Sequence, residues 1–183
     1  YVDLVFPVLH GEFGEDGQVQ KLIEQQGFPY VGCDIPCSEL CIDKKATVQA
    51  LRNAQLPVCN SIILSSPSDA IPDNITFPCV VKPNRQGSSI SLSLVKEAKD
   101  LAPAIELAFK NDSSVLVESF FQGVECTVGL IDGKALDVVE IIPPDGFFDF
   151  DAKYTYAQGK TEYNCPPTKI PATVQKRLQD CAE

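Results

Sequence analysis

Several residue types and patterns are scarce or missing in this 183-residue sequence. It has no methionine or tryptophan and one histidine, and no apolar run approaches the ~20 residues that a membrane-spanning helix needs. Its 15 lysines and arginines are outnumbered by 25 acidic residues, which gives a formal net charge of -10. We therefore expect no basic face for a nucleic-acid backbone, and neither DNA, RNA nor a membrane as a partner.

The start of the chain also lacks a feature, namely a charged and then apolar leader with a small-residue cleavage site. The sequence opens at Tyr1, already inside an apolar run. We expect the chain to be an excised or processed part of a longer polypeptide. Apolar residues make up 44% of the chain, which is enough for the core of an ordinary globular protein of one or two domains.

Eight cysteines raise the alternatives of disulfides, a metal site or plain packing. Cys33, Cys37 and Cys41 recur every four residues, but no Cys-x-x-Cys pair occurs and His10 is distant in sequence, which disfavours zinc. Disulfide scaffolds are usually much shorter chains with poor cores. We expect reduced thiols in an intracellular compartment, packed as small hydrophobic side chains.

The periodicity of apolar residues predicts alternating strands and helices, and hence an α/β fold. A buried strand is expected over 4–9 and a helix over 17–26, with Val19, Leu22 and Ile23 on one face and Asp16 as its cap. Asp132-Gly133 is a strong hairpin signal. A long loop is expected over 143–168, and a domain boundary near Asp43. The other expected strands are 61–64, 78–82, 90–95, 115–118, 125–131 and 134–142, and the other expected helices follow Asp34, end near Asn111 and cover 171–182.

A possible phosphate site follows the strand over 78–82. Lys82 supplies a fixed positive charge, Gly87 allows the backbone to approach closely, and Ser88 and Ser89 add hydroxyl donors. The spacing is not that of a Walker A loop. The segment indicates a nucleotide, and a simply solvated lysine is the alternative.

Two further groups have the chemistry of a binding site. His10 begins a glycine-rich turn that runs to Gly17 between a strand and a helix, a place suited to a substrate carboxylate. The alternative is a tight turn capped by Asp16. Glu118 ends a strand and Glu125 begins the next. Their carboxylates could accept hydrogen bonds from the hydroxyl groups of a ribose or the amino group of a base. The alternative is that they are ordinary surface glutamates without such a role.

Together these segments resemble the D-alanine–D-alanine ligases of the ATP-grasp superfamily over essentially the whole chain. The resemblance rests on six ordered elements. They are His10 to Gly17, Pro29-Tyr30-Val31-Gly32, Cys41-Ile42-Asp43-Lys44, Val81-Lys82-Pro83 with Gly87-Ser88-Ser89, Val115-Leu116-Val117-Glu118, and Phe147-Phe148-Asp149-Phe150-Asp151-Ala152-Lys153-Tyr154.

The resemblance implies an incomplete ATP-grasp fold preceded by the end of a Rossmann-like domain. Residues 1–44 would close that N-terminal substrate-binding domain, and residues 45–183 would form the central subdomain and the start of the C-terminal subdomain. The implied reaction is ATP-dependent joining of two D-alanines through an acyl phosphate. D-Alanine and ATP are the implied partners, in the cytoplasm or, for a plant-like source, the plastid stroma.

Residue roles follow from the same resemblance. Lys44, Lys82 and Ser89 would hold the nucleotide phosphates, and Lys153 would reach the transferred phosphate. The remaining roles would place Glu118 and the backbone of Phe121 at adenine, Glu125 at the ribose, and His10, Ser88 and Tyr154 around the D-alanine substrates.

Some family features depart or are missing. Ile90-Ser91 replaces the usual Val-Gly, and Phe148 and Phe150 stand where relatives often have tyrosine. The ligands for Mg²⁺ or Mn²⁺ are expected after Glu183, so no metal-binding residue is assigned in this chain and the isolated segment is expected to be inactive. Three alternative functions stay open, namely a ligase with D-lactate as acceptor, another carboxylate–amine ligase and a non-catalytic nucleotide-binding module. The parent protein could be a homodimer or a tandem fusion.

Overall fold

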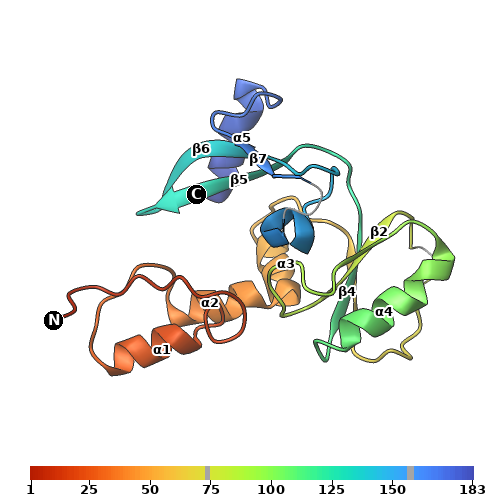
Figure 1. Cartoon of the computed structure of the whole chain (residues 1–183), viewed down its shortest axis with the longest axis horizontal. Coiled ribbons are helices and arrows are strands. Elements are labelled where there is room, and N and C mark those ends of the chain that lie inside the picture. The colour runs from red at the N-terminus through yellow and green to blue at the C-terminus, as the bar shows by residue number, and fades with distance from the viewer. Residues whose placement is uncertain (73–74, 156–158) are drawn as a thin grey trace. The chain divides into compact units, whose positions relative to one another are not determined.

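The computed structural model describes residues 1–72, 75–155 and 159–183. They form two compact units, Tyr1–Phe120 and Phe121–Glu183, and each is described by itself. Figure 1 shows the helices and strands of both units. Among the described residues, no helix is long and apolar enough to cross a membrane.

The first unit opens with an extended segment and a short helix, α1 (Gln18–Gln25). The prediction of a buried strand over 4–9 is wrong. Only Val5 makes a strand-like bridge, to Tyr30, and the apolar side chains around it are exposed because no strand flanks them on either side. Helix α1 agrees with the prediction and buries Val19 and Ile23, whereas Leu22 faces solvent.

Two helices follow, and they are separated at Asp43. Helix α2 (Ile35–Ile42) starts after Asp34, whose carboxylate accepts a hydrogen bond from the backbone N–H of Cys37. Helix α3 (Lys44–Asn53) starts after Asp43, which caps it in the same way through the N–H of Ala46. Because Asp43 has an extended backbone, the chain turns there and begins a new helix with Lys44.

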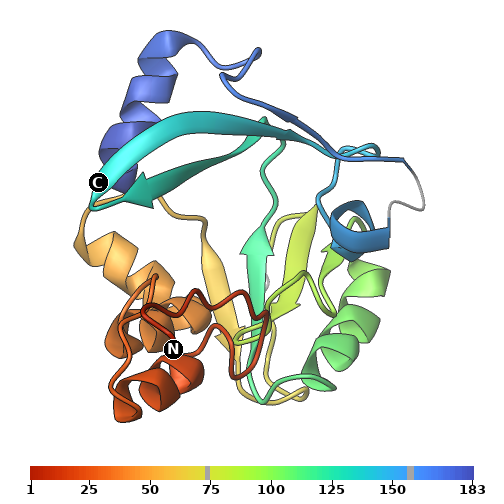
Figure 2. The same cartoon turned by 60° about the vertical axis from the view of Figure 1, so that its left-hand side comes forward.

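A four-stranded antiparallel sheet forms the core of the first unit, in the order β1-β4-β2-β3. Its strands are β1 (Ser61–Leu64), β2 (Cys79–Pro83), β3 (Ser93–Val95) and β4 (Val115–Ser119). Figure 2 shows α4 (Leu101–Phe109) beside this sheet, after the short helical turn η1 (Ala98–Asp100). Alternation along β2 and β4 sends Val81 and Val117 into the core with α4. The opposite face therefore carries Lys82 and Glu118.

Strand β3 is shorter than predicted. The sequence suggested a strand over 90–95, but Ser88, Ser89 and Ser91 have φ angles of 55°, 57° and 52°. This left-handed conformation is uncommon for non-glycine residues and is incompatible with a strand. The chain therefore turns through this segment before it enters the sheet at Ser93.

The second unit contains a sheet of β5 (Glu125–Ile131), β6 (Lys134–Ile142) and β7 (Glu162–Asn164), with helix α5 (Ala172–Ala182). The predicted hairpin is confirmed. Asp132 and Gly133 both have positive φ angles, 50° and 72°, as a two-residue turn between twisted strands requires. Helix α5 packs against β6 and β5.

The segment over 143–168, predicted as one long loop, contains two short elements. A π-helical turn η2 (Asp151–Thr155) carries Lys153 and Tyr154, and β7 pairs with β6. Three-residue strands and single helical turns carry no detectable periodicity, so neither could be predicted from the pattern of residues. Residues 156–158 of this loop lie outside the described part.

All eight cysteines lie within the described residues and are free thiols. The expectation that they pack as small hydrophobic residues holds for Cys79, which is buried in the core. It fails for Cys33, Cys41, Cys165 and Cys181, which are exposed. Their positions lie outside the buried strand and helix faces, so no core is available to them.

Candidate functional site: two lysines beside the central sheet

Lys82 and Glu118 form an ion pair on the face of the sheet opposite α4. They come from the neighbouring strands β2 and β4, where Glu118 pairs in register with Val80. Both side chains are largely buried, with 21% and 16% of their surface exposed. The strands thus hold one cation and one carboxylate in fixed positions.

Lys44 brings a second positive charge to the same region from the first turn of α3. Its Nζ donates to the carbonyl oxygens of Asn84, at 3.1 Å, and Gln86, at 2.7 Å. Burial lowers the pKa of Lys44 to about 8, and repulsion from the Lys82 ammonium acts in the same direction. The protein therefore holds two cations near each other at an energetic cost.

Asn84 and Asp43 fix the position of Lys44. The buried Asn84 donates from Nδ2 to Asp43 Oδ1 at 3.0 Å and accepts from the backbone N–H of Lys45 at 2.9 Å. Asp43 also accepts from Arg85 Nε at 3.2 Å. Sequence reasoning assigned no role to Asn84. The position of Asp43 just before a helix is a recognisable capping pattern. Nothing near Asn84 in the sequence indicates that it pairs with Asp43, forty-one residues away.

The loop over residues 84–89, called the serine loop here, lies beside the glycine-rich turn that begins at His10. A side chain at Gly87 would meet Glu15 Oε2 at 3.0 Å and would also approach Gly11. The same Glu15 oxygen accepts from the backbone N–H of Gly11 at 2.6 Å. The first unit therefore brings Gly87, the residue before Ser88, next to the turn that begins at His10. His10 itself is exposed.

Asp16 was expected to cap α1, but this prediction is wrong, because the residue at the N-cap makes no side-chain cap. Gly17 occupies the capping position, while the Asp16 carboxylate accepts from the backbone N–H groups of Phe13 and Gln18. Burial is the largest single effect on the pKa of Asp16 and raises it. The hydrogen bonds together outweigh burial, so the pKa is lowered below its usual value. The tight-turn interpretation of this segment is therefore correct, and it does not exclude substrate binding by the neighbouring His10.

The other predicted site residues belong to the second unit. Phe121 is 69% exposed, and Glu125 begins β5. Loss of solvation raises the pKa of Glu125, and the positive charge of Lys153 opposes that rise. Lys153 also lies over the Phe148 ring, 4.9 Å from its centre, and Tyr154 packs on Phe150 with ring centres 5.1 Å apart. Lys153 and Glu125 are thus in electrostatic range of each other.

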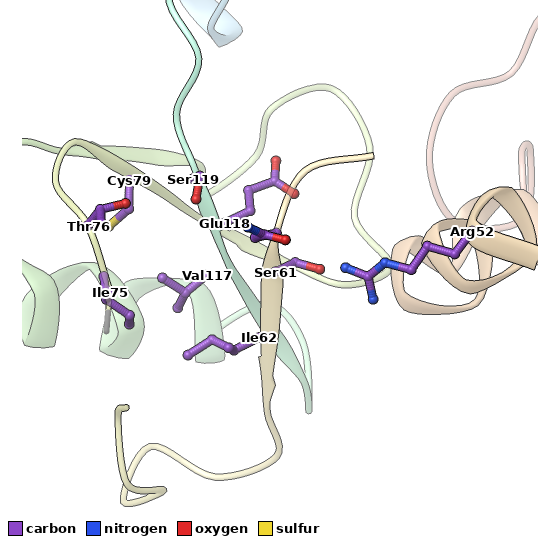
Figure 3. Close-up of a pocket in the computed structure, with 10 residues that line it drawn as sticks. Arg52, Ser61, Ile62, Ile75, Thr76, Cys79, Val117, Glu118 and Ser119 are labelled. Atoms are coloured by element: carbon purple, nitrogen blue, oxygen red, sulfur yellow. The ribbon is translucent and has the colours of Figure 1, made fainter. Parts of the chain in front are cut away.

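A cavity of about 420 Å³ lies at the edge of the first unit's sheet, next to the ion pair. Figure 3 shows Arg52 extending from α3 toward Ser61 on β1, with Glu118 nearby. Ile62, Ile75 and Val117 form its apolar wall. The cavity shares Glu118 with the lysine pair, so polar and apolar surfaces adjoin at the end of β4.

A divalent cation does not fit the residues present. Within residues 1–72, 75–155 and 159–183, no three histidine, cysteine, aspartate or glutamate side chains are grouped to hold a metal ion. Glu118, the carboxylate beside Lys82, is already paired with it. No chemical step is therefore derived through a metal on this chain.

The arrangement is suited to binding a polyanion. Two largely buried ammonium groups from α3 and β2 are close enough to repel each other. A bound phosphate chain would replace that repulsion with attraction and would raise the pKa of Lys44. Fixed cations that neutralise phosphate charge are also what phosphoryl transfer requires.

Sequence comparison assigns most of the chain to two family models. Residues 56–183 match the model described as "D-ala D-ala ligase C-terminus", and residues 1–33 match "D-ala D-ala ligase N-terminus". The chain is 39% identical over 180 residues to the D-alanine–D-alanine ligase of Geobacter sulfurreducens. This match covers 97% of the present chain and 56% of the relative. The chain is also 40% identical to that of Syntrophotalea carbinolica, with 99% and 58% covered.

Solved structures give the same picture. The VanG D-Ala:D-Ser ligase from Enterococcus faecalis is 39% identical, with a TM-score of 0.81, covering 99% of this chain and 54% of its own. The Bacillus anthracis D-alanine–D-alanine ligase complexed with ATP is 30% identical, with a TM-score of 0.79, covering 98% and 57%. The α/β class and the ATP-grasp assignment are thereby confirmed. The chain spans a little over half the length of the curated relatives it matches.

Proposed function

The chain belongs to the D-alanine–D-alanine ligase family, and from this premise we propose that it supplies most of the ATP-binding part of an enzyme that joins two D-alanines. In this proposal residues 1–44 end a substrate-binding domain, and residues 45–183 belong to the ATP-grasp domain. The products are D-alanyl-D-alanine, ADP and phosphate. The dipeptide would serve cell-wall peptidoglycan synthesis.

The proposed roles divide the site by the chemistry of ATP. Lys44 and Lys82 neutralise the phosphates, and Ser89 donates to them from the serine loop. Glu118 and the backbone of Phe121 contact adenine, while Glu125 accepts from the ribose hydroxyls. Glutamate suits both places, since a carboxylate accepts hydrogen bonds from amino and hydroxyl groups.

The reaction requires two steps. A carboxylate oxygen of the first D-alanine attacks the γ-phosphorus of ATP, the bond from that phosphorus to the bridging oxygen breaks, and ADP leaves. The neutral amine of the second D-alanine then attacks the acyl carbon, and phosphate leaves with the original carboxylate oxygen. Lys153 stabilises the charge of the transferred group, and His10, Ser88 and Tyr154 position the amino acids.

The single observation that supports this proposal most strongly is the pair of lysines beside the sheet. Lys44 donates to two backbone carbonyls, and Lys82 is paired with Glu118. Even so, burial and the positive charge of Lys82 lower the pKa of Lys44. A solvated surface lysine would not have these constraints. The arrangement has the positive charge that a nucleoside triphosphate needs. Holding the two ammonium groups close together costs free energy when no anion is bound.

A second candidate function differs only in the acceptor. The similarity to a D-Ala:D-Ser ligase at 39% identity favours D-serine as an alternative second substrate. A D-lactate acceptor and a non-catalytic nucleotide-binding role are further alternatives. In each of them the lysine pair would still bind the nucleotide phosphates.

The experiment that tests the proposal measures dipeptide formation by the full-length protein with ATP, Mg²⁺ and D-alanine, using chromatography and a coupled ADP assay. We expect one dipeptide per ADP, and D-alanine should outcompete D-serine and D-lactate as acceptor. ATP binding without ADP formation would favour the non-catalytic role. Preferential formation of D-alanyl-D-serine would move the enzyme to the second candidate function.

A further inference from the structure

The loop between β6 and β7 carries Lys153 and Tyr154, and a buried hydroxyl group secures it. Thr161, only 1% exposed, stands just before β7. Its Oγ1 donates to the backbone carbonyl oxygen of Ala152 at 2.6 Å. Ala152 is itself buried and immediately precedes Lys153.

The hydrogen bond spans the loop at a useful position. It joins the second residue of the turn η2 to the residue that enters β7, across nine positions of sequence. Strand β7 is in turn paired with β6, where Ile142 lies opposite Glu162. Thr161 therefore connects the turn that presents Lys153 to the sheet of the second unit.

Three further hydrogen bonds shape the turn from within. Ala152 donates its backbone N–H to Asp149 Oδ1 at 2.9 Å, and Lys153 donates its own to the Asp149 carbonyl oxygen at 3.2 Å. Thr155 Oγ1 donates to Asp151 Oδ1 at 3.0 Å. These bonds span three or four residues, so they define the turn without fixing it to the sheet.

Buried polar residues also fix the chain beyond β7. The Glu140 carboxylate on β6 is fully buried and accepts from the backbone N–H and the hydroxyl of Thr168, both at 2.9 Å. The far end of β7 is therefore held to β6 as well. The strand to which Thr161 connects the turn is a rigid reference for it.

We propose that Thr161 is a positioning residue for the candidate phosphate-contacting Lys153 and its neighbour Tyr154. It acts through the Ala152 carbonyl and touches neither substrate nor nucleotide itself. The inference rests on the proposed function for its catalytic consequence, whereas the anchoring of the turn is independent of that function. Losing the hydroxyl would leave a buried carbonyl without its donor, and the turn would detach to regain solvent.

The test compares Thr161→Val, which keeps the shape and removes the hydroxyl, with Thr161→Ser, which keeps the hydroxyl. In the full-length protein we expect Thr161→Val to lower kcat/KM for D-alanine about 10- to 100-fold, mainly through kcat. Its Kd for ATP should stay within about twofold of the original protein. Thr161→Ser should stay within about threefold in kcat/KM.

A second measurement does not depend on activity. Trypsin cleaves after lysine, and cleavage after Lys153 requires the turn to detach from the sheet. We expect Thr161→Val to speed this cleavage about 10-fold and Thr161→Ser to leave it nearly unchanged, under conditions where thermal melting shows both variants folded. Thr161→Ala, which also lacks the hydroxyl, should speed it as well and serves if Thr161→Val does not fold.

The outcomes separate the two proposals. If the original protein forms no dipeptide but Thr161→Val is cleaved faster, the proposed function fails and the anchoring holds. The inference is overturned if Thr161→Val keeps both the original kcat/KM and the original cleavage rate. It is also overturned if Thr161→Ser loses as much as Thr161→Val, because the methyl group would then be the part that matters.

Discussion

Lys44 and Lys82 reach the same region from different elements, one from the first turn of α3 and the other from the middle of the sheet. Burial and the repulsion between them lower the pKa of Lys44 to about 8. Asn84 makes the arrangement possible because its carbonyl oxygen accepts from the Lys44 ammonium while its side chain holds the start of α3. These hydrogen bonds hold Lys44 in place at the start of α3.

The lysine pair leads to a first prediction about affinity. Lys82→Ala and Lys44→Ala should each weaken ATP binding by about 1.5 to 3 kcal/mol, because each removes a largely buried contact between a cation and phosphate. Titration calorimetry on the full-length protein measures the change. Lys45→Ala, on the same helix with an exposed side chain, is the matched control and should bind as the original does. Equal affinities for all three variants would remove the phosphate assignment.

The pKa of Lys44 predicts how stability depends on pH. Because its pKa is about 8 in the folded protein and about 10.5 when unfolded, the unfolded chain holds the extra proton between these values. Stability should therefore rise as pH increases from about 8 to about 10.5, by about 1 to 3 kcal/mol after solvent screening is allowed for. Urea unfolding of the original protein and Lys44→Gln measures this, and the variant should lack that rise. Identical slopes would show that Lys44 is not held at a cost.

Local signals in the sequence predicted the fold well where a short segment decides the conformation. Asp132-Gly133 alone specifies a tight hairpin, and the strands on either side were predicted at the bounds that the structure shows. Residues 90–92 were wrongly predicted to begin a strand, because the positive φ angles of Ser88, Ser89 and Ser91 have no compositional signal. Strand 4–9 failed for another reason, since an apolar run becomes a strand only when neighbours pair with it.

The site divides along the same line. Lys44 was assigned to the site because it belongs to an ordered motif of the family, whereas Lys82 and Glu118 were also singled out by their places at strand ends. Asn84 and Thr161 were missed because their importance comes from partners that are distant in sequence or separated by a loop. A single polar residue in a loop has no periodic pattern, so only the three-dimensional contacts reveal what it does.

Asn84 gives a prediction about stability. Asn84→Ala removes the donor to Asp43 and the acceptor of the Lys45 N–H, both in partly buried hydrogen bonds of the buried Asn84 side chain. We expect a loss of about 1 to 3 kcal/mol in the free energy of unfolding, since the Lys45 N–H loses its acceptor and Asp43 loses one of its donors. Urea unfolding measures it, with the exposed Asn53→Ala at the end of α3 as the control. A loss in Asn84→Ala no larger than in the control would show that Asn84 does not support the start of α3.

Tyr154 gives a prediction about the acceptor. It packs on Phe150, and 45% of the residue, which carries a phenolic hydroxyl group, is exposed. If that hydroxyl helps to select the acceptor, Tyr154→Phe should reduce the preference for D-alanine over D-lactate by about 1 to 3 kcal/mol, or about 5- to 150-fold in relative kcat/KM. Competition between the two acceptors measures the ratio. A purely packing role predicts that both rates fall together and the ratio stays the same.

The central claim is that this family member activates a D-alanine carboxylate by phosphorylation with ATP. The most direct measurement supplies the full-length protein with ATP, Mg²⁺ and D-alanine labelled with ¹⁸O in its carboxylate, and then analyses the products by mass spectrometry. The account predicts D-alanyl-D-alanine together with inorganic phosphate that carries one ¹⁸O atom, because the carboxylate oxygen leaves with the phosphate when the amine attacks. Dipeptide formed with unlabelled phosphate, or ATP hydrolysis without dipeptide, would contradict it.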